Sequence, residues 1–146
     1  HLTNFVLNDK CASGAGIFLE TVAEMLKLTV AEIGPASLRS AKRVALTTTC
    51  VVFAESEIVA EIHRGATKED ILSGVNESLV SKVISISSRV GVEPEVTLTG
   101  GVAKNVGIIE TFRRQLGLGP RVSDFPEIAG ALGAAILAGI FTGEAK

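Results

Sequence analysis

Three short apolar segments of this chain each end in small or polar residues and then run into a pattern of helical spacing. The segments are residues 2–7, 43–48 and 95–99, and the steps after them are residues 11–16, 49–50 and 100–101. Such runs are typical of strands, and strands that alternate with helices are typical of α/β domains. We therefore expect an α/β fold, with helices flanking a mostly parallel sheet.

The helices are predicted from apolar residues that recur every three or four positions. They are expected at residues 14–28, at 30–35 up to Gly34 and Pro35, at 51–64 before Gly65, at 67–90 before Gly91, at 105–116, and from 127 onward. Thr67 and Asp70 have the spacing of a capping box. The inward faces are predicted to hold Ile71, Val75, Leu79, Val83 and Ile86 in the long helix, and Val106, Ile109 and Phe112 in the next.

Residues 128–143 form the longest uncharged stretch. It is shorter than the ~20 residues that a membrane-spanning helix needs, and it is rich in Ala and Gly. The stretch is therefore predicted to be a buried helix, and no membrane association is expected.

The composition narrows the class of protein. The 146 residues are 47% hydrophobic with a net charge of −2; this apolar content excludes a disordered tail, and no basic surface points to nucleic acid. Two cysteines do not make the disulfide framework of a small secreted domain, and no signal peptide is visible. We expect a single domain over residues 1–146, located in the cytoplasm.

The segment from Thr99 to Asn105, which includes Gly100 and Gly101, is the best candidate for binding a ligand. Ligands of open α/β sheets gather at the carboxyl ends of strands, and paired glycines let the backbone approach a ligand closely. The same residues could form only a strand-to-helix turn, because short glycine motifs are common.

Cys11 and Cys50 lie far apart in the sequence, without a C-x-x-C motif. One interpretation is that both are simply buried small residues, since free Cys is often buried. However, both are predicted at the start of a helix, where the helix dipole favours a thiolate. If a two-fold axis passed between two chains, they would together supply four ligands.

Other polar residues fit simpler roles. His63 is expected to be a favourable charge at the end of a helix. Glu55 and Glu57 lie on different helix faces, so they are not a catalytic pair. Arg113 and Arg114 are interpreted as a solvated face, and no Ser–His–Asp arrangement is visible.

Four segments in this order resemble one family. They are NDKCASGAG from residue 8, TTTCVVFAESE from 47, VTLTGGVAKN from 96 and GALGAAILA from 130. The chain resembles the BadF/BadG/BcrA/BcrD-type ATPases, which comprise 2-hydroxyacyl-CoA dehydratase activators and benzoyl-CoA reductase ATPase subunits. The resemblance covers residues 5–138, nearly the whole chain.

The resemblance implies an actin-like, ribonuclease H-like fold, of which residues 1–146 would be the C-terminal lobe without the N-terminal lobe. Family members are homodimers or paired homologous subunits that share one 4Fe–4S cluster, with two Cys from each chain. By this resemblance, Cys11 and Cys50 are cluster ligands. Gly100, Gly101 and Asn105 belong to the adenosine-binding motif for ATP or ADP with Mg, and residues 130–133 resemble the second connecting motif.

The chain also departs from the family pattern. Many activators read Gly-Thr-Gly-Arg where this chain has GAGI at residues 14–17. Neither of the family's two phosphate-binding loops is found within the 146 residues. We therefore expect that this chain alone does not hydrolyse ATP and binds adenine nucleotides weakly if at all.

The leading functional hypothesis is an ATP-dependent activator that passes one electron to a 2-hydroxyacyl-CoA dehydratase. One alternative is the ATPase subunit of a reductase of aromatic acyl-CoA such as benzoyl-CoA. Another is a non-redox nucleotide-binding lobe like those of sugar kinases, in which the two Cys are merely packed.

Overall fold

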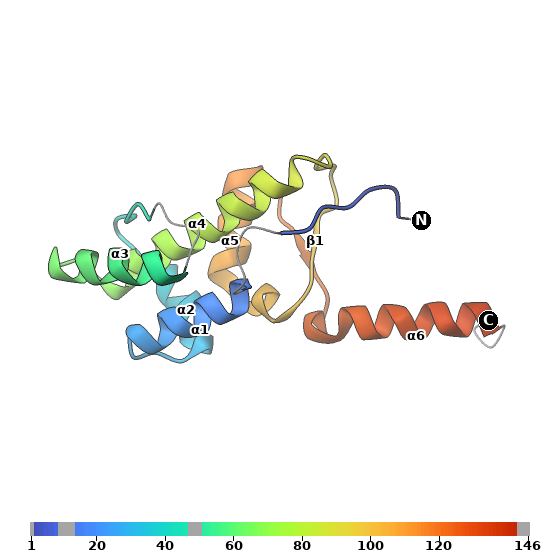
Figure 1. The fold of residues 1–146 in the computed structure, drawn as a ribbon, viewed down its shortest axis with the longest axis horizontal. Helices are drawn as coiled ribbons and strands as arrows, with labels where there is room; N and C mark the ends of the chain where they lie inside the picture. Colours follow the sequence, from blue (N-terminus) through green and yellow to red (C-terminus); the bar gives the residue numbers. More distant parts are fainter. Residues whose placement is uncertain (1, 9–13, 47–50, 143–146) are drawn as a thin grey trace.

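The computed structural model describes residues 2–8, 14–46 and 51–142, and it has helices with a small parallel sheet (Figure 1). The elements are α1 (Ala15–Met25), α2 (Val30–Ser37), α3 (Val51–His63), α4 (Lys68–Ser87), β1 (Thr97–Leu98), η1 (Gly101–Lys104), α5 (Val106–Leu116), β2 (Arg121–Val122), η2 (Pro126–Ile128) and α6 (Ala129–Thr142). β1 and β2 pair in parallel, with Thr97 opposite Arg121. The α/β class and the parallel pairing are as predicted.

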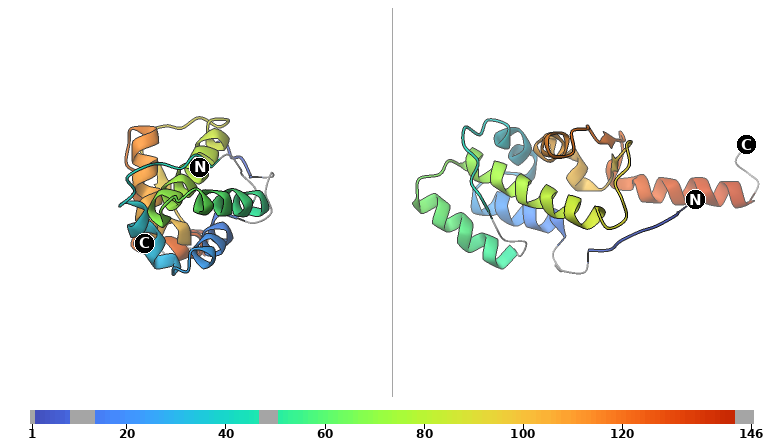
Figure 2. Two further views of the ribbon diagram at one scale, coloured as in Figure 1. Left: turned by 90° about the vertical axis from the view of Figure 1, so that its left-hand side faces the viewer. Right: turned by 90° about the horizontal axis from the view of Figure 1, so that it is seen from above.

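Helix α4 lies at the centre of the molecule, and α2 and α5 pack against it. α1 and α3 pack on the side of α2 and of the first half of α4 (Figures 1 and 2). The helices α1 to α5 together are called the body below. The fully buried side chains at the centre of this core are Leu19, Val22, Ile33, Ile58, Ile71, Leu72 and Val75. Each stabilises the fold by about 1.5–3 kcal/mol through the loss of apolar surface to water.

The inward faces of α4 and α5 differ in part from the prediction. Ile71 and Val75 are fully buried, but Val83 near the end of α4 is 41% exposed. In α5, Ile108 and Phe112 are buried, whereas Val106 is 43% exposed. The first turn of α5 sits against α2 through a glycine at position 107, so the buried face of α5 is rotated away from Val106.

The start of α4 carries half of the predicted capping box. Thr67 Oγ1 accepts a hydrogen bond from the Asp70 backbone N–H at 3.2 Å. The Asp70 carboxylate accepts from the backbone N–H groups of Ala41 and Lys42 at 3.0 and 2.8 Å, and from the Ser40 hydroxyl at 2.8 Å. Asp70 therefore ties the loop after α2 to the start of α4.

Helix α2 is longer than predicted. It does not stop at Gly34 and Pro35 but continues to Ser37, because Ala36 and Ser37 are buried in the body. Its start is fixed by Glu32, whose carboxylate accepts from the Thr29 backbone N–H at 2.7 Å. These bonds lower the pKa of Glu32, with the Thr29 backbone N–H as the largest cause.

The strands predicted at residues 2–7 and 43–48 are wrong over the residues that the structure describes. Residues 2–7 and 43–46 are not strands in the described part of the chain. A strand needs a neighbouring backbone to pair with, and described β-pairing involves only β1 and β2. Residues 43–46 pack on α4 instead: a Cβ at Gly74 would lie 2.2 Å from the Val44 carbonyl oxygen.

The prediction of a buried C-terminal helix is also wrong. α6 forms, but none of its residues is buried, and it projects from the body (Figures 1 and 2). Its apolar residues have nothing to pack against among the described residues. Within those residues no helix is both long and apolar enough to cross a membrane.

Candidate nucleotide site

The turn after β1 has a conformation that selects glycine. Gly100 has φ +91°, in the left-handed region where other residues are strained. Its N–H donates to the Pro126 carbonyl at 2.7 Å. At Gly101 a Cβ would meet no atom within 4 Å. The space beside the Gly101 backbone is therefore open, and the hydrogen bond from Gly100 to Pro126 anchors the turn.

Asn105 ends this turn and caps the next helix. Its Oδ1 accepts from the backbone N–H groups of Gly107 and Ile108 at 2.9 and 3.2 Å. Those amides are therefore used within the protein, so the start of α5 is not a free anion site of the kind found at uncapped helices.

The other half of the Asn105 amide is unusual. Its Nδ2 atom is buried and has no hydrogen-bond partner. A buried donor without a partner carries a desolvation cost, on the order of 1–3 kcal/mol.

An ion pair connects the turn to the start of the last helix. Lys104 in η1 pairs with Glu127 in η2, and this contact is the largest cause of a lowered pKa of Glu127. Together with the bond from Gly100 to Pro126, the pair clamps residues 100–104 onto η2. The Lys104 charge is therefore already paired with a carboxylate.

Two cavities bounded by described residues lie elsewhere. One, of about 560 Å³, runs along α4 beside Val44 and Leu46. The other, of about 400 Å³, is lined mainly by apolar residues of α4, α5 and β1. Neither of these two cavities includes Gly100, Gly101 or Asn105.

Cys11 and Cys50 lie outside the described residues, and their predicted role as metal ligands stays a prediction. Among the described residues, no cluster of three or more His, Cys, Asp or Glu could hold a metal ion. Helices α1 and α3 follow the two cysteines in the sequence and pack against each other. In Figure 1 and in the right-hand view of Figure 2, both helices begin on the same side and run in the same general direction.

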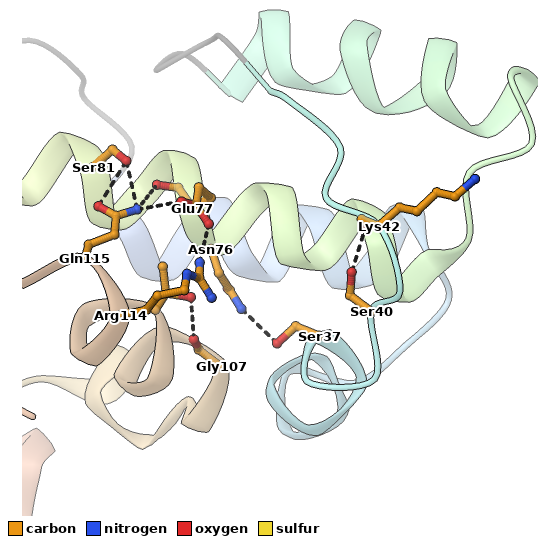
Figure 3. Close-up of polar contacts among 10 residues, drawn as sticks. Ser37, Ser40, Lys42, Asn76, Glu77, Ser81, Gly107, Arg114 and Gln115 are labelled. Atoms are coloured by element: carbon orange, nitrogen blue, oxygen red, sulfur yellow. Dashed lines mark hydrogen bonds and ion pairs between the residues drawn. The ribbon is translucent and has the colours of Figure 1, made fainter. Parts of the chain in front are cut away.

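Several ion pairs and hydrogen bonds between different elements were not predicted from the sequence. Arg114 is not simply solvated but pairs with Glu77 of α4, and Gln115 donates to Glu77 and to Ser81 at 3.1 and 3.0 Å (Figure 3). The capping role of Asn105 has a sequence signal, because Asn before an apolar-periodic run is a common helix start. The ion pair of Lys104 and Glu127 has no such sequence signal, since it joins separate elements.

His63 lies in the last turn of α3, as expected.

Known proteins similar to this chain were found by sequence and by structure. The (R)-2-hydroxyglutaryl-CoA dehydratase activating ATPase of Acidaminococcus fermentans is 42% identical over 137 residues, which are 94% of this chain and 53% of that protein. A benzoyl-CoA reductase subunit of Thauera aromatica is 30% identical over 113 residues, 77% of this chain and 40% of that protein.

A solved structure agrees with the sequence similarity. The activator of the 2-hydroxyisocaproyl-CoA dehydratase from Clostridium difficile, with bound ADPNP, superposes with a TM-score of 0.89 at 40% identity, covering 98% of this chain and 53% of that one. The fold is thus that of the actin-like activator ATPases. The chain spans about half the length of the curated activators that it matches.

The family model described as the BadF/BadG/BcrA/BcrD ATPase family matches residues 1–138. With the fold, the turn after β1 and these relatives in agreement, the chain belongs to the BadF/BadG/BcrA/BcrD ATPase family.

Proposed function

We propose that this chain is the C-terminal lobe of an ATP-dependent one-electron-transfer activator that reduces a 2-hydroxyacyl-CoA dehydratase. The observation that carries the proposal is the match of nearly the whole chain to a nucleotide-bound dehydratase activator. The A. fermentans activator is also more similar in sequence to this chain than the benzoyl-CoA reductase protein of T. aromatica, at 42% against 30% identity. This difference favours the activator over the reductase ATPase, which remains the second candidate.

The nucleotide, ATP or ADP with Mg, is proposed to bind with its adenosine against Gly100, Gly101 and Asn105. The open space over Gly101 and the left-handed turn at Gly100 support this placement. The capped start of α5 supports a role away from the phosphates. A ligand here can influence the rest of the protein only if it binds two arrangements with different affinity.

Cys11 and Cys50 are proposed to hold a 4Fe–4S cluster together with the same two residues of a second chain. One chain has two Cys, and such a cluster takes four thiolates, so the donor set fits a dimer-bridging site. The common starting side of α1 and α3 supports the proposal, because helix N-termini favour thiolates. When bound, the cluster would supply a single transferable electron.

Anaerobic reconstitution with iron and sulfide tests the redox half of the proposal. The wild-type chain should give a brown dimer that dithionite bleaches, and Cys11→Ser and Cys50→Ser should each stay colourless. His63→Ala is the matched control, since His63 lies at the far end of α3 and should leave the colour unchanged. Colourless wild-type monomers would instead favour a non-redox nucleotide-binding lobe.

Titration of the protein that carries both lobes with ADP tests the nucleotide half. Gly101→Val should remove binding, because the branched side chain fills the open space, while circular dichroism and the unfolding midpoint stay as in the wild type. Unchanged ADP affinity in Gly101→Val would show that the glycine pair is only a turn.

A further inference from the structure

A buried polar junction joins α2, α4 and α5 just behind the candidate nucleotide turn (Figure 3). Ser37 of α2 and Asn76 of α4 are only 6% and 3% exposed. Asn76 Nδ2 donates to Ser37 Oγ at 2.9 Å, and Ser37 Oγ donates to the Gly34 carbonyl at 2.7 Å. The contact lies outside the residues assigned to the nucleotide motif.

The first turn of α5 rests directly on this junction. A Cβ at Gly107 would lie 2.1 Å from Ser37 Oγ and 2.5 Å from Asn76 Nδ2. The Gly107 carbonyl accepts from the buried Thr111 hydroxyl at 2.8 Å, so both sides of this turn are engaged. Only glycine at this position lets α5 approach α2 and α4 so closely.

Helix α2 makes a second close approach, to the capping residue itself. A Cβ at Gly34 would lie 2.7 Å from Asn105 Oδ1 and 3.2 Å from the Val106 backbone nitrogen. Glycine inside a helix weakens that helix, so the two close approaches come at a cost to α2 and α5. Satisfied buried polar contacts of this kind specify one geometry more strongly than apolar packing does.

We propose that Ser37, Asn76 and the glycines at 34 and 107 are positioning residues for the nucleotide turn, an inference that rests on the proposed nucleotide site. They act through Asn105: the junction fixes the start of α5, Asn105 caps that start, and residues 100–104 end at Asn105. α2 also packs on α1, and α1 contacts η1. A ligand that shifts the turn therefore acts on α2 and α1, the helix that follows Cys11 in the sequence.

Amide hydrogen exchange of the turn tests the proposal without any ligand. The N–H groups of Ala103 and Asn105 are bonded to the carbonyls of Gly100 and Val102 and report on the turn directly. Gly107→Ala should speed their exchange about tenfold or more relative to the wild type, and Ser37→Ala should do so more weakly, because the turn opens more often.

Gly74→Ala is the matched control. Its Cβ would lie 2.2 Å from the Val44 carbonyl oxygen, a clash of the same kind between α4 and residues 43–46 rather than between α4 and α5. It should leave exchange of Ala103 and Asn105 within about twofold once global unfolding is subtracted. Equal effects of Gly74→Ala and Gly107→Ala, or no effect of Gly107→Ala and Ser37→Ala, would overturn the proposal.

A parallel ADP titration of the protein with both lobes separates this proposal from the function on which it rests. In Gly107→Ala the affinity should fall about tenfold, while Gly74→Ala binds like the wild type. If the wild-type protein with both lobes bound no adenine nucleotide, the proposed function would fail, and the exchange rates would still decide whether the junction positions the turn.

Discussion

The body and helix α6 are both rich in apolar residues, yet they differ completely in burial. Ile71 in α4 is fully buried, whereas Leu132 and Ile136 in α6 are 50% and 53% exposed. α4 carries five charged residues along its length, at positions 68–70, 77 and 82, and α2 and α5 cover it. α6 has no charged residue on any face, so its sequence predicts burial without indicating which elements supply it.

The largest expected effect is in the body. Ile71→Ala should lower the free energy of unfolding by about 2–5 kcal/mol, because it leaves a cavity among fully buried neighbours. Urea unfolding followed by circular dichroism measures the change. A loss below about 0.5 kcal/mol would mean that the body around α4 is not a rigid core.

The stability that Asp70 adds by binding the loop after α2 should depend on pH. Hydrogen bonds from the Lys42 backbone N–H, then from Ser40, hold the pKa of Asp70 below its ordinary value of 3.8. A lowered pKa means that Asp70 stabilises the fold above that ordinary value and that this contribution is lost as the pH falls through the folded pKa. Wild-type stability should therefore decrease in acid.

Asp70→Asn is the comparison for this prediction. It should be less stable than the wild type at neutral pH, and the difference should shrink as the pH falls below 3.8. Urea unfolding at a series of pH values measures it. A difference that stays constant into acid would show that the charge of Asp70 does not matter to the loop.

A smaller effect is expected where the body meets α6. Lys104→Gln removes the ion pair with Glu127, which joins η1 to η2. Exposed ion pairs contribute little to global stability, so the unfolding midpoint should stay the same. Amide exchange in η2 and the first turn of α6 should accelerate, since their anchor is weaker. Arg113→Gln, which removes an exposed pair within α5, is the control that should leave this exchange unchanged.

The smallest effect is expected in α6. Ile136→Ala should change the free energy of unfolding of this chain by less than about 0.5 kcal/mol, because Ile136 is 53% exposed. The measurement is the one used for Ile71→Ala. A loss as large as that of Ile71→Ala would show that α6 packs on the body in solution.

Local signals in the sequence predicted the helices well. The start of α1, the extent of α3 and the turn at Gly100 follow from short-range periodicity and from glycine. The strand predictions at residues 2–7 and 43–46 were wrong, since an apolar run forms a strand only beside another backbone. The face of α5 was misjudged because the contact of Gly107 with Ser37 and Asn76 joins residues that are far apart in the sequence.

The candidate site divides in the same way. Gly100, Gly101 and Asn105 could be proposed from the sequence because they belong to one short motif, and their role in binding a nucleotide stays a prediction. The clamp from Lys104 to Glu127 and the junction behind Asn105 could not, because each depends on how separate helices pack. The assignment of Cys11 and Cys50 came from family resemblance and lies outside the described residues.

The distribution of the core along the chain bears on how the protein folds during synthesis. Every residue of the two apolar clusters lies between Phe18 and Leu116, and none comes from α6. Domains synthesised from the N-terminus can fold once their core residues have left the ribosome. The core of the body does not need α6, so residues 18–116 can pack while α6 is still inside the ribosome.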